Sequence, residues 1–424
     1  MLYTGMKTED YKARSSEYTE PASTASTSTR RGFKTSTLFR RVVILIASLT
    51  IYAVYKNTNT MVSADVHLSH YTDSIFIPFI YKFRTKHVPQ VMCTIQGVEI
   101  KMPVDTGSTG TLIGAPILPN ISPTAGTPVH HFFTSSKILY VGRLLELPID
   151  FVGEAGSYAT ATAPILIVDK SWRCPWYDAS IDRFECPVGP NGELAQERST
   201  SNITYMGVGF GRNGPRDGMP YATPNVNPFL NIDAIDGDPV SKGAMRTGYV
   251  ISTEGIQLGL TTINTLGFAF ANLEPGLTHV EDSRDWAMAK MCFSIDGEGS
   301  NCGPALIDTG IPQMYIRAEE GASIPTVFIP NPNPNGTAGM VKRVKPGTKI
   351  TVGFPSLGRP AASYSFVVGD NSSIEPSYVF PQLPQHPPFV NTGQNFLFGY
   401  SIAFDAVGGR FGFRPVGSPS SSVL

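Results

Sequence analysis

The sequence predicts an all-β protein made of two related β lobes. Two observations favour many short strands and turns: glycine (41 residues) and proline (35) are frequent, and only 16% of the 424 residues are charged. A third observation indicates duplication. An apolar strand runs into Asp-Thr-Gly at Asp105 and again at Asp308, 203 residues later (308 minus 105). We therefore expect each lobe to offer one Asp to a shared cleft.

Each Asp-Thr-Gly tripeptide follows a hairpin pattern. Before the first, apolar residues alternate with polar ones over 91–95 and 98–104, and Gln96-Gly97 provides the turn. Before the second, a strand at 291–295 is followed by the turn-rich 296–300, and the apolar residues before Asp308 form the returning strand. This placement puts a carboxylate at the end of a strand, with a residue lacking Cβ close behind it.

These motifs resemble those of the pepsin-like aspartic proteases, and the resemblance covers roughly residues 87 to 416. Two segments away from the tripeptides carry it further. Residues 203–211 (ITYMGVGFG) are similar to the family's apolar-apolar-Gly segment, which passes behind the first Asp loop. Residues 393–397 (GQNFL), with Tyr400, 404–405 and 411–413, are similar to the family's closing strands in order and spacing. The resemblance implies a bilobal fold with two β-barrel-like lobes and the active-site cleft between them.

The resemblance also implies roles for the residues of both motifs. Asp105 and Asp308 would be the catalytic pair, in which two close carboxyls share one proton as is known for aspartic proteases. The hydroxyls of Thr106 and Thr309 would each bond the backbone of the opposite loop. Gly107 and Gly310 would let backbone amides approach the carboxylates, and Ser108 would hydrogen-bond the outer oxygen of Asp105. The alternative is that Asp-Thr-Gly only makes turns, as Asp and Gly often do.

The chain departs from the family pattern at several positions. Ile311 stands where a second Ser or Thr usually follows Asp-Thr-Gly, so we expect Asp308 to lose its outer hydrogen-bond partner. Leu112 stands where many members have tryptophan, and Asn391-Thr392 replaces the usual apolar pair before glycine. A hairpin over 132–142 with a Ser-Ser-Lys tip lies where the family folds a flap over its cleft. Tyr140 is the candidate flap tyrosine, and a plain surface or core tyrosine is the alternative.

The chain is expected to have five parts. These are a disordered cytosolic tail (1–41), a signal anchor or signal-peptide apolar segment (42–55), a luminal stem (56–86), an N-terminal protease lobe (87–230) and a C-terminal protease lobe (231–424). Fourteen uncharged residues with Arg40-Arg41 before them favour a retained type II anchor, with the region beyond translocated to the lumen or cell exterior. Cleavage after the small residues 62–64 and a buried element of a cytosolic domain remain as alternatives.

Charge is distributed unevenly between the N-terminal region and the body. Residues 1–64 carry nine Lys/Arg and four Asp/Glu, so the remainder has 24 basic (33 minus 9) and 30 acidic residues (34 minus 4), a net charge of −6. An acidic body argues against nucleic-acid binding and suits the secretory pathway.

Sequons and cysteines agree with translocation. Four glycosylation sequons begin at Asn120, Asn202, Asn335 and Asn371. Of the five cysteines, short separations suggest that Cys174 pairs with Cys186 and Cys292 with Cys302, which leaves Cys93 as a buried thiol. The cysteines lack metal-site spacing, so we expect no metal and no cofactor.

The sequence thus predicts a monomeric aspartic endopeptidase, membrane-anchored or secreted, that holds a peptide or protein substrate in the interlobe cleft. The membrane would be contacted through the N-terminal segment. The alternative function is a catalytically impaired pepsin-fold protein that binds peptides, proteins or glycans in the same cleft.

Overall fold

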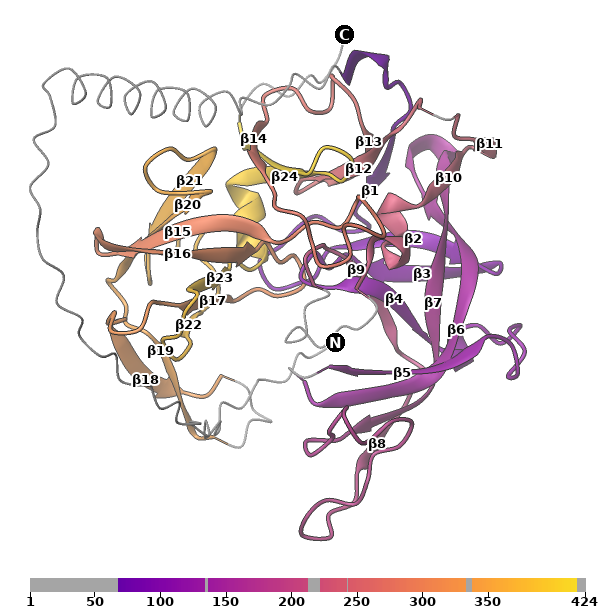
Figure 1. Ribbon diagram of the computed structural model, residues 1–424, viewed down its shortest axis with the longest axis horizontal. Helices are drawn as coiled ribbons and strands as arrows, with labels where there is room; N and C mark the ends of the chain where they lie inside the picture. The colour runs from indigo at the N-terminus through magenta and orange to yellow at the C-terminus, as the bar shows by residue number, and fades with distance from the viewer. Residues whose placement is uncertain (1–67, 134–135, 213–221, 242, 333–337, 418–424) are drawn as a thin grey trace, which may run out of the picture. The chain divides into compact units, whose positions relative to one another are not determined.

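The structure is a computed structural model that describes residues 68–133, 136–212, 222–241, 243–332 and 338–417 (Figure 1). These residues contain 25 strands and six short 3-10 helices, so the all-β prediction is confirmed. The predicted tail and apolar segment, 1–41 and 42–55, lie outside the described residues. Within the part that is described, no helix is long and apolar enough to cross a membrane. The 3-10 helices are η1 (Leu68–His70), η2 (Ala115–Ile117), η3 (Glu154–Gly156), η4 (Pro224–Val226), η5 (Pro228–Leu230) and η6 (Gln394–Phe398).

A ten-stranded sheet holds the first Asp-Thr-Gly motif. Its main path runs β11-β10-β7-β6-β2-β3, with β4 pairing β7 and β9, β5 pairing β6, and β8 pairing β7 (Figure 1). The strands are β2 (Gln90–Ile95), β3 (Val98–Pro103), β4 (Thr109–Gly114), β5 (Thr127–Phe133), β6 (Ile138–Val152), β7 (Tyr158–Arg173), β8 (Gln196–Arg198), β9 (Thr204–Val208), β10 (Ile232–Ile235) and β11 (Asp238–Pro239).

A seven-stranded sheet holds the second motif. Its order is β21-β20-β15-β16-β23-β17-β22. The strands are β15 (Ala289–Ile295), β16 (Glu298–Leu306), β17 (Met314–Arg317), β20 (Lys349–Phe354), β21 (Ala362–Val367), β22 (Val379–Pro381) and β23 (Phe389–Asn391). A separate hairpin joins β18 (Thr326–Pro330) to β19 (Met340–Val344).

A six-stranded sheet gathers strands from distant parts of the chain. Its order is β1-β13-β12-β24-β25-β14. The strands are β1 (Ile75–Pro78), β12 (Arg246–Ile251), β13 (Gly255–Leu260), β14 (Ala269–Asn272), β24 (Tyr400–Asp405) and β25 (Arg410–Pro415). β1 comes from the later part of the predicted stem and pairs antiparallel with β13, so this part of the stem belongs to a sheet.

The hairpins before both Asp-Thr-Gly motifs form as predicted. β2 and β3 pair antiparallel, and their turn residues Gln96 and Gly97 have φ of 51° and 75°. The second turn is tighter than the expected 296–300, because Asp296 and Gly297 alone make it, with φ of 53° and 82°. Two-residue turns with positive φ match the twist of paired strands, and Asp-Gly is well suited to them. Each hairpin leads its returning strand directly to an Asp.

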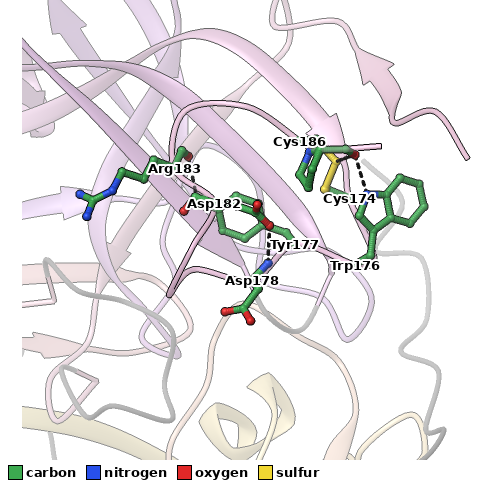
Figure 2. The surroundings of a disulfide bond; sticks show 8 residues. Cys174, Trp176, Tyr177, Asp178, Asp182, Arg183 and Cys186 are labelled. Carbon is green, nitrogen blue, oxygen red and sulfur yellow. Dashed lines mark hydrogen bonds between the residues drawn. A yellow bond between two sulfur atoms is a disulfide. The ribbon is translucent and has the colours of Figure 1, made fainter. Parts of the chain in front are cut away.

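Both predicted disulfides are present. Cys174–Cys186 closes a loop after β7, and Cys292–Cys302 joins opposite residues of β15 and β16. In the first loop the Trp176 indole donates to the Pro187 carbonyl at 2.7 Å, and the Tyr177 hydroxyl donates to the Arg183 carbonyl at 2.8 Å (Figure 2). Cys93 is a free, buried thiol on β2, as predicted.

Candidate active site

The two Asp residues leave their sheets in equivalent ways. Asp105 follows β3, and its backbone N–H donates to the Met206 carbonyl of β9 at 3.1 Å. Asp308 follows β16, which pairs parallel with β23. A single passing strand therefore lies beside each Asp loop. Both carboxyl side chains are buried, with Asp105 5% and Asp308 6% exposed.

Crossed hydrogen bonds from two threonines tie the loops together. The Thr106 hydroxyl donates to the Ile307 carbonyl at 2.6 Å, and the Thr309 hydroxyl donates to the Val104 carbonyl at 2.6 Å. Each hydroxyl also accepts the backbone N–H of the other threonine at 3.0 Å. The predicted bonding of each threonine to the opposite loop is confirmed. Because these groups are buried and mutually satisfied, they fix the separation of the two loops.

The two glycines are required by close approach. A Cβ placed on Gly107 would collide with the carboxyl of Asp308, and one on Gly310 would collide with the carboxyl of Asp105. The Gly107 N–H donates to Asp105 Oδ1 at 2.7 Å, and the Gly310 N–H donates to Asp308 Oδ1 at 2.8 Å. Both predicted roles of these glycines are confirmed. Any side chain at either position would push the carboxyls apart.

The electrostatics of the pair favour one shared proton. Burial, and next repulsion by the charge of Asp105, raises the pKa of Asp308 to about 8. A hydrogen bond between the two carboxyls acts in the same direction. Two buried carboxyls in contact cannot both ionise at low cost, so Asp308 holds its proton to a higher pH than an isolated Asp does.

Asp105 receives hydroxyl donors at its outer oxygen. The Ser108 hydroxyl donates to Asp105 Oδ2 at 2.7 Å, which confirms the predicted partner. The Tyr205 hydroxyl, from β9, also donates to Asp105 Oδ2 at 2.7 Å and lies 2.5 Å from Ser108 Oγ. Hydrogen bonds to a carboxylate are stronger than neutral ones, so this arrangement stabilises charge on Asp105.

The expectation that Ile311 leaves Asp308 without an outer partner is wrong. Asn391, the last residue of β23, donates from Nδ2 to Asp308 Oδ2 at 2.7 Å. Ile311 has no hydroxyl to offer and its side chain is buried, so the donor to this oxygen comes from the neighbouring strand and not from the loop. Two departures from the family pattern, at Ile311 and at Asn391, are thus connected in space.

Sequence reasoning missed Tyr205 and gave no role to Asn391. One signal was present in the sequence, because each residue lies on the strand that passes its Asp and stands two positions before a glycine, Gly207 or Gly393. Polar donors at these two positions, in place of apolar residues, mark the strand contacts to the carboxyls.

Among the described residues, no hydrogen bond joins Tyr140 to either carboxyl. Tyr140 is on β6, opposite His131 of β5, and its ring packs edge-on against Phe133 with centroids 5.7 Å apart. Phe133 in turn packs against Tyr205 at 5.3 Å. The predicted hairpin is present, but the tip residues 134–135 lie outside the described residues. The tyrosine that reaches a carboxyl is Tyr205, and the flap role of Tyr140 stays a prediction.

The remaining site predictions concern glycans and metals. Asn120, Asn202 and Asn371 are exposed, as glycosylation requires, whereas Asn335 lies outside the described residues. Across the described ranges, no group of three or more His, Cys, Asp or Glu side chains is placed to hold a metal ion. No protein-family model matches the sequence, and no curated protein matches it either.

Proposed function

We propose that this protein is an aspartic endopeptidase of the bilobal, pepsin-like type. The observation that carries the proposal is the crossed threonine bracing, which holds Asp105 and Asp308 in hydrogen-bonding contact at the ends of two sheets. Turn formation alone does not require two Asp-Thr-Gly loops to bond each other. The resemblance in motif order supports the same conclusion.

In the proposed reaction, the charged Asp105 accepts a proton from a water as that water attacks the carbonyl carbon of the peptide bond. Asp308, whose pKa is raised by burial and by Asp105, gives its proton to the carbonyl oxygen. The product of this step is a tetrahedral diol. Asp105 then passes its proton to the leaving nitrogen, the C–N bond breaks, and Asp308 recovers a proton from a diol hydroxyl. Both carboxyls return to their starting states.

We also infer a place in the secretory pathway, either tethered as a type II membrane protein or released by cleavage. The uncharged segment 42–55, the basic residues before it and the acidic body support this inference. Two disulfides fit an oxidising compartment.

The test is cleavage of a mixed peptide library by the full chain in detergent, from about pH 3 to 8. We expect cleavage that pepstatin inhibits, and its loss in both Asp105→Asn and Asp308→Asn. The matched control is Asp233→Asn, which changes an exposed Asp outside the motifs and should retain full activity. If the well-folded wild type cleaves nothing at any pH, the alternative, a pepsin-fold binding protein, replaces this proposal.

A further inference from the structure

The strands beside the two Asp loops occupy matching registers. Asp105 lies opposite Gly207 in a parallel bridge. Leu306 lies opposite Asn391 in the parallel pair β16–β23. Asp308 and Gly393 each stand two residues beyond this pair in the sequence, at the places that correspond to Asp105 and Gly207. Tyr205 and Asn391 therefore hold the same position, two residues before the corresponding glycine.

Both residues use that position for the same contact. The Tyr205 hydroxyl and the Asn391 amide each donate to Oδ2 of the neighbouring Asp, both at 2.7 Å. Gly107 and Gly310 donate to the other oxygen, Oδ1, in each loop. Each carboxyl thus accepts a loop N–H at Oδ1 and a strand side chain at Oδ2, and Oδ2 of Asp105 also accepts the Ser108 hydroxyl from its own loop.

We propose that Tyr205 and Asn391 are a matched pair of positioning residues, each of which donates to Oδ2 of its own Asp and so sets the pH range over which that carboxyl loses its proton. The expected changes in reaction rate rest on the proposed function. The expected changes in the protonation of the two carboxyls do not, because each carboxyl has its own donor from an equivalent strand position.

The chemical difference between the two donors supports separate control of the two carboxyls. The Asn391 side-chain oxygen accepts the Gly393 N–H at 3.0 Å, which leaves only its NH₂ group to face Asp308. Asn391 can therefore donate to Asp308 but cannot accept a proton from it at that contact. The donor weakens the hold of Asp308 on its proton, and so opposes the effects of burial and of Asp105.

On the Asp105 side, two hydroxyls can rearrange. Tyr205 Oη, Ser108 Oγ and Asp105 Oδ2 form three contacts, but the two hydroxyls supply only two hydrogens. When Asp105 is charged, both hydrogens can point to it. Phe133 holds the Tyr205 ring in place from β5, with their planes inclined at 71°.

The first test is the pH dependence of kcat/KM for the full chain. Tyr205→Phe removes one donor from the charged Asp105, so we expect the acidic limb to move upward by roughly one pH unit with the basic limb unchanged. Asn391→Leu removes a donor from Asp308, so the basic limb should move upward by roughly one pH unit with the acidic limb unchanged. A purely structural role would lower the rate without moving one limb selectively.

A rescue variant separates loss of the donor from loss of packing. Ile311 stands three residues after Asp308, as Ser108 stands three after Asp105. In Asn391→Leu combined with Ile311→Ser, a loop hydroxyl can replace the strand amide, and the basic limb should return toward the wild-type value. The proposal would be overturned if the acidic and basic limbs of the pH profile moved together in either single variant. It would also be overturned if the added serine did not restore the basic limb.

A readout without substrate keeps the two proposals distinguishable. The free energy of unfolding of Asn391→Leu, measured between pH 4 and 9, should keep falling at a higher pH than that of the wild type, because Asp308 holds its proton longer. If this shift appears in a chain that cleaves no peptide, the positioning role stands and the protease function fails. If peptides are cleaved but neither the limbs nor the unfolding curve shift, the positioning role fails alone.

Discussion

Asp308 and Asp405 are both buried carboxylic acids, but their neighbours carry opposite charges. Asp405, at the end of β24, is fully buried between Arg246 and Arg410, and each guanidinium makes two hydrogen bonds to it. Asp308 faces Asp105 and accepts hydrogen bonds from the side-chain amide of Asn391 and the backbone N–H of Gly310. Burial with cations gives a fixed ion pair. Burial against a second carboxyl leaves a proton that can be exchanged, which is what acid–base chemistry needs.

The largest expected effect concerns the pH dependence of stability. Because the pKa of Asp308 is raised from 3.8 to about 8, the folded state keeps a proton that the unfolded chain releases. The contribution of the protonated Asp308 to the free energy of unfolding is complete below about pH 4 and is lost as the pH rises toward 8. In Asp308→Asn there is no such proton to lose, so at pH 8 we expect this variant to be more stable than the wild type by several kcal/mol.

Urea unfolding at pH 4, 6 and 8 measures this difference. Asp105→Asn provides a second check, because it removes the repulsion that raises the pKa of Asp308 and should flatten the curve in part. Parallel curves for the wild type and Asp308→Asn would contradict the shared-proton description of the pair.

The next effect tests the other carboxyl. Asp405→Asn removes the charge between two buried arginines whose side chains are only 8% and 10% exposed. Breaking a buried ion pair from one side costs about 3–5 kcal/mol, since the remaining cations lose their compensation. The same Asp-to-Asn change should therefore destabilise at position 405 and stabilise at position 308 at pH 8. Equal signs at the two positions would show that burial, and not the neighbouring charge, decides the effect.

Part of this arrangement follows from local sequence. The two hairpins and both disulfides depend on short spacings along the chain, whereas the threonine bracing and the Ser108 contact were implied by the resemblance of the repeated motif to that of the pepsin-like proteases. The contacts of Tyr205 and Asn391, which join residues 100 and 83 positions apart, belong neither to a short spacing nor to the repeated motif and could not be predicted in the same way. Which side chain of a passing strand meets a loop depends on strand register, and a shift of one residue would turn it to the other face.

The smallest effect concerns a third buried titratable group, His131, which burial keeps neutral by lowering its pKa. His131 of β5 is 5% exposed, and its Nε2 has no hydrogen-bond partner among the described residues. Burial, and next repulsion by His130, lowers the pKa of His131 to about 4. A depressed pKa contributes stability that is present above about pH 6.5 and lost as the pH falls toward 4.

Replacing His131 by Leu removes an imidazole that takes up a proton at a higher pH in the unfolded chain than in the folded protein. Relative to the wild type, we expect His131→Leu to gain about 3 kcal/mol in the free energy of unfolding between pH 7 and pH 4. Comparing the variants by urea unfolding at the two pH values cancels any packing change that is independent of pH. His130→Leu is the matched control, because the lowered pKa of the less buried His130 predicts a smaller gain of the same sign. A gain at His130 as large as that at His131 would mean that burial does not control these groups. Between about pH 4 and 6.5, His131 and Asp308 change the free energy of unfolding in opposite directions and largely offset each other, so the loss caused by Asp308 should appear in the wild type mainly above about pH 6.5.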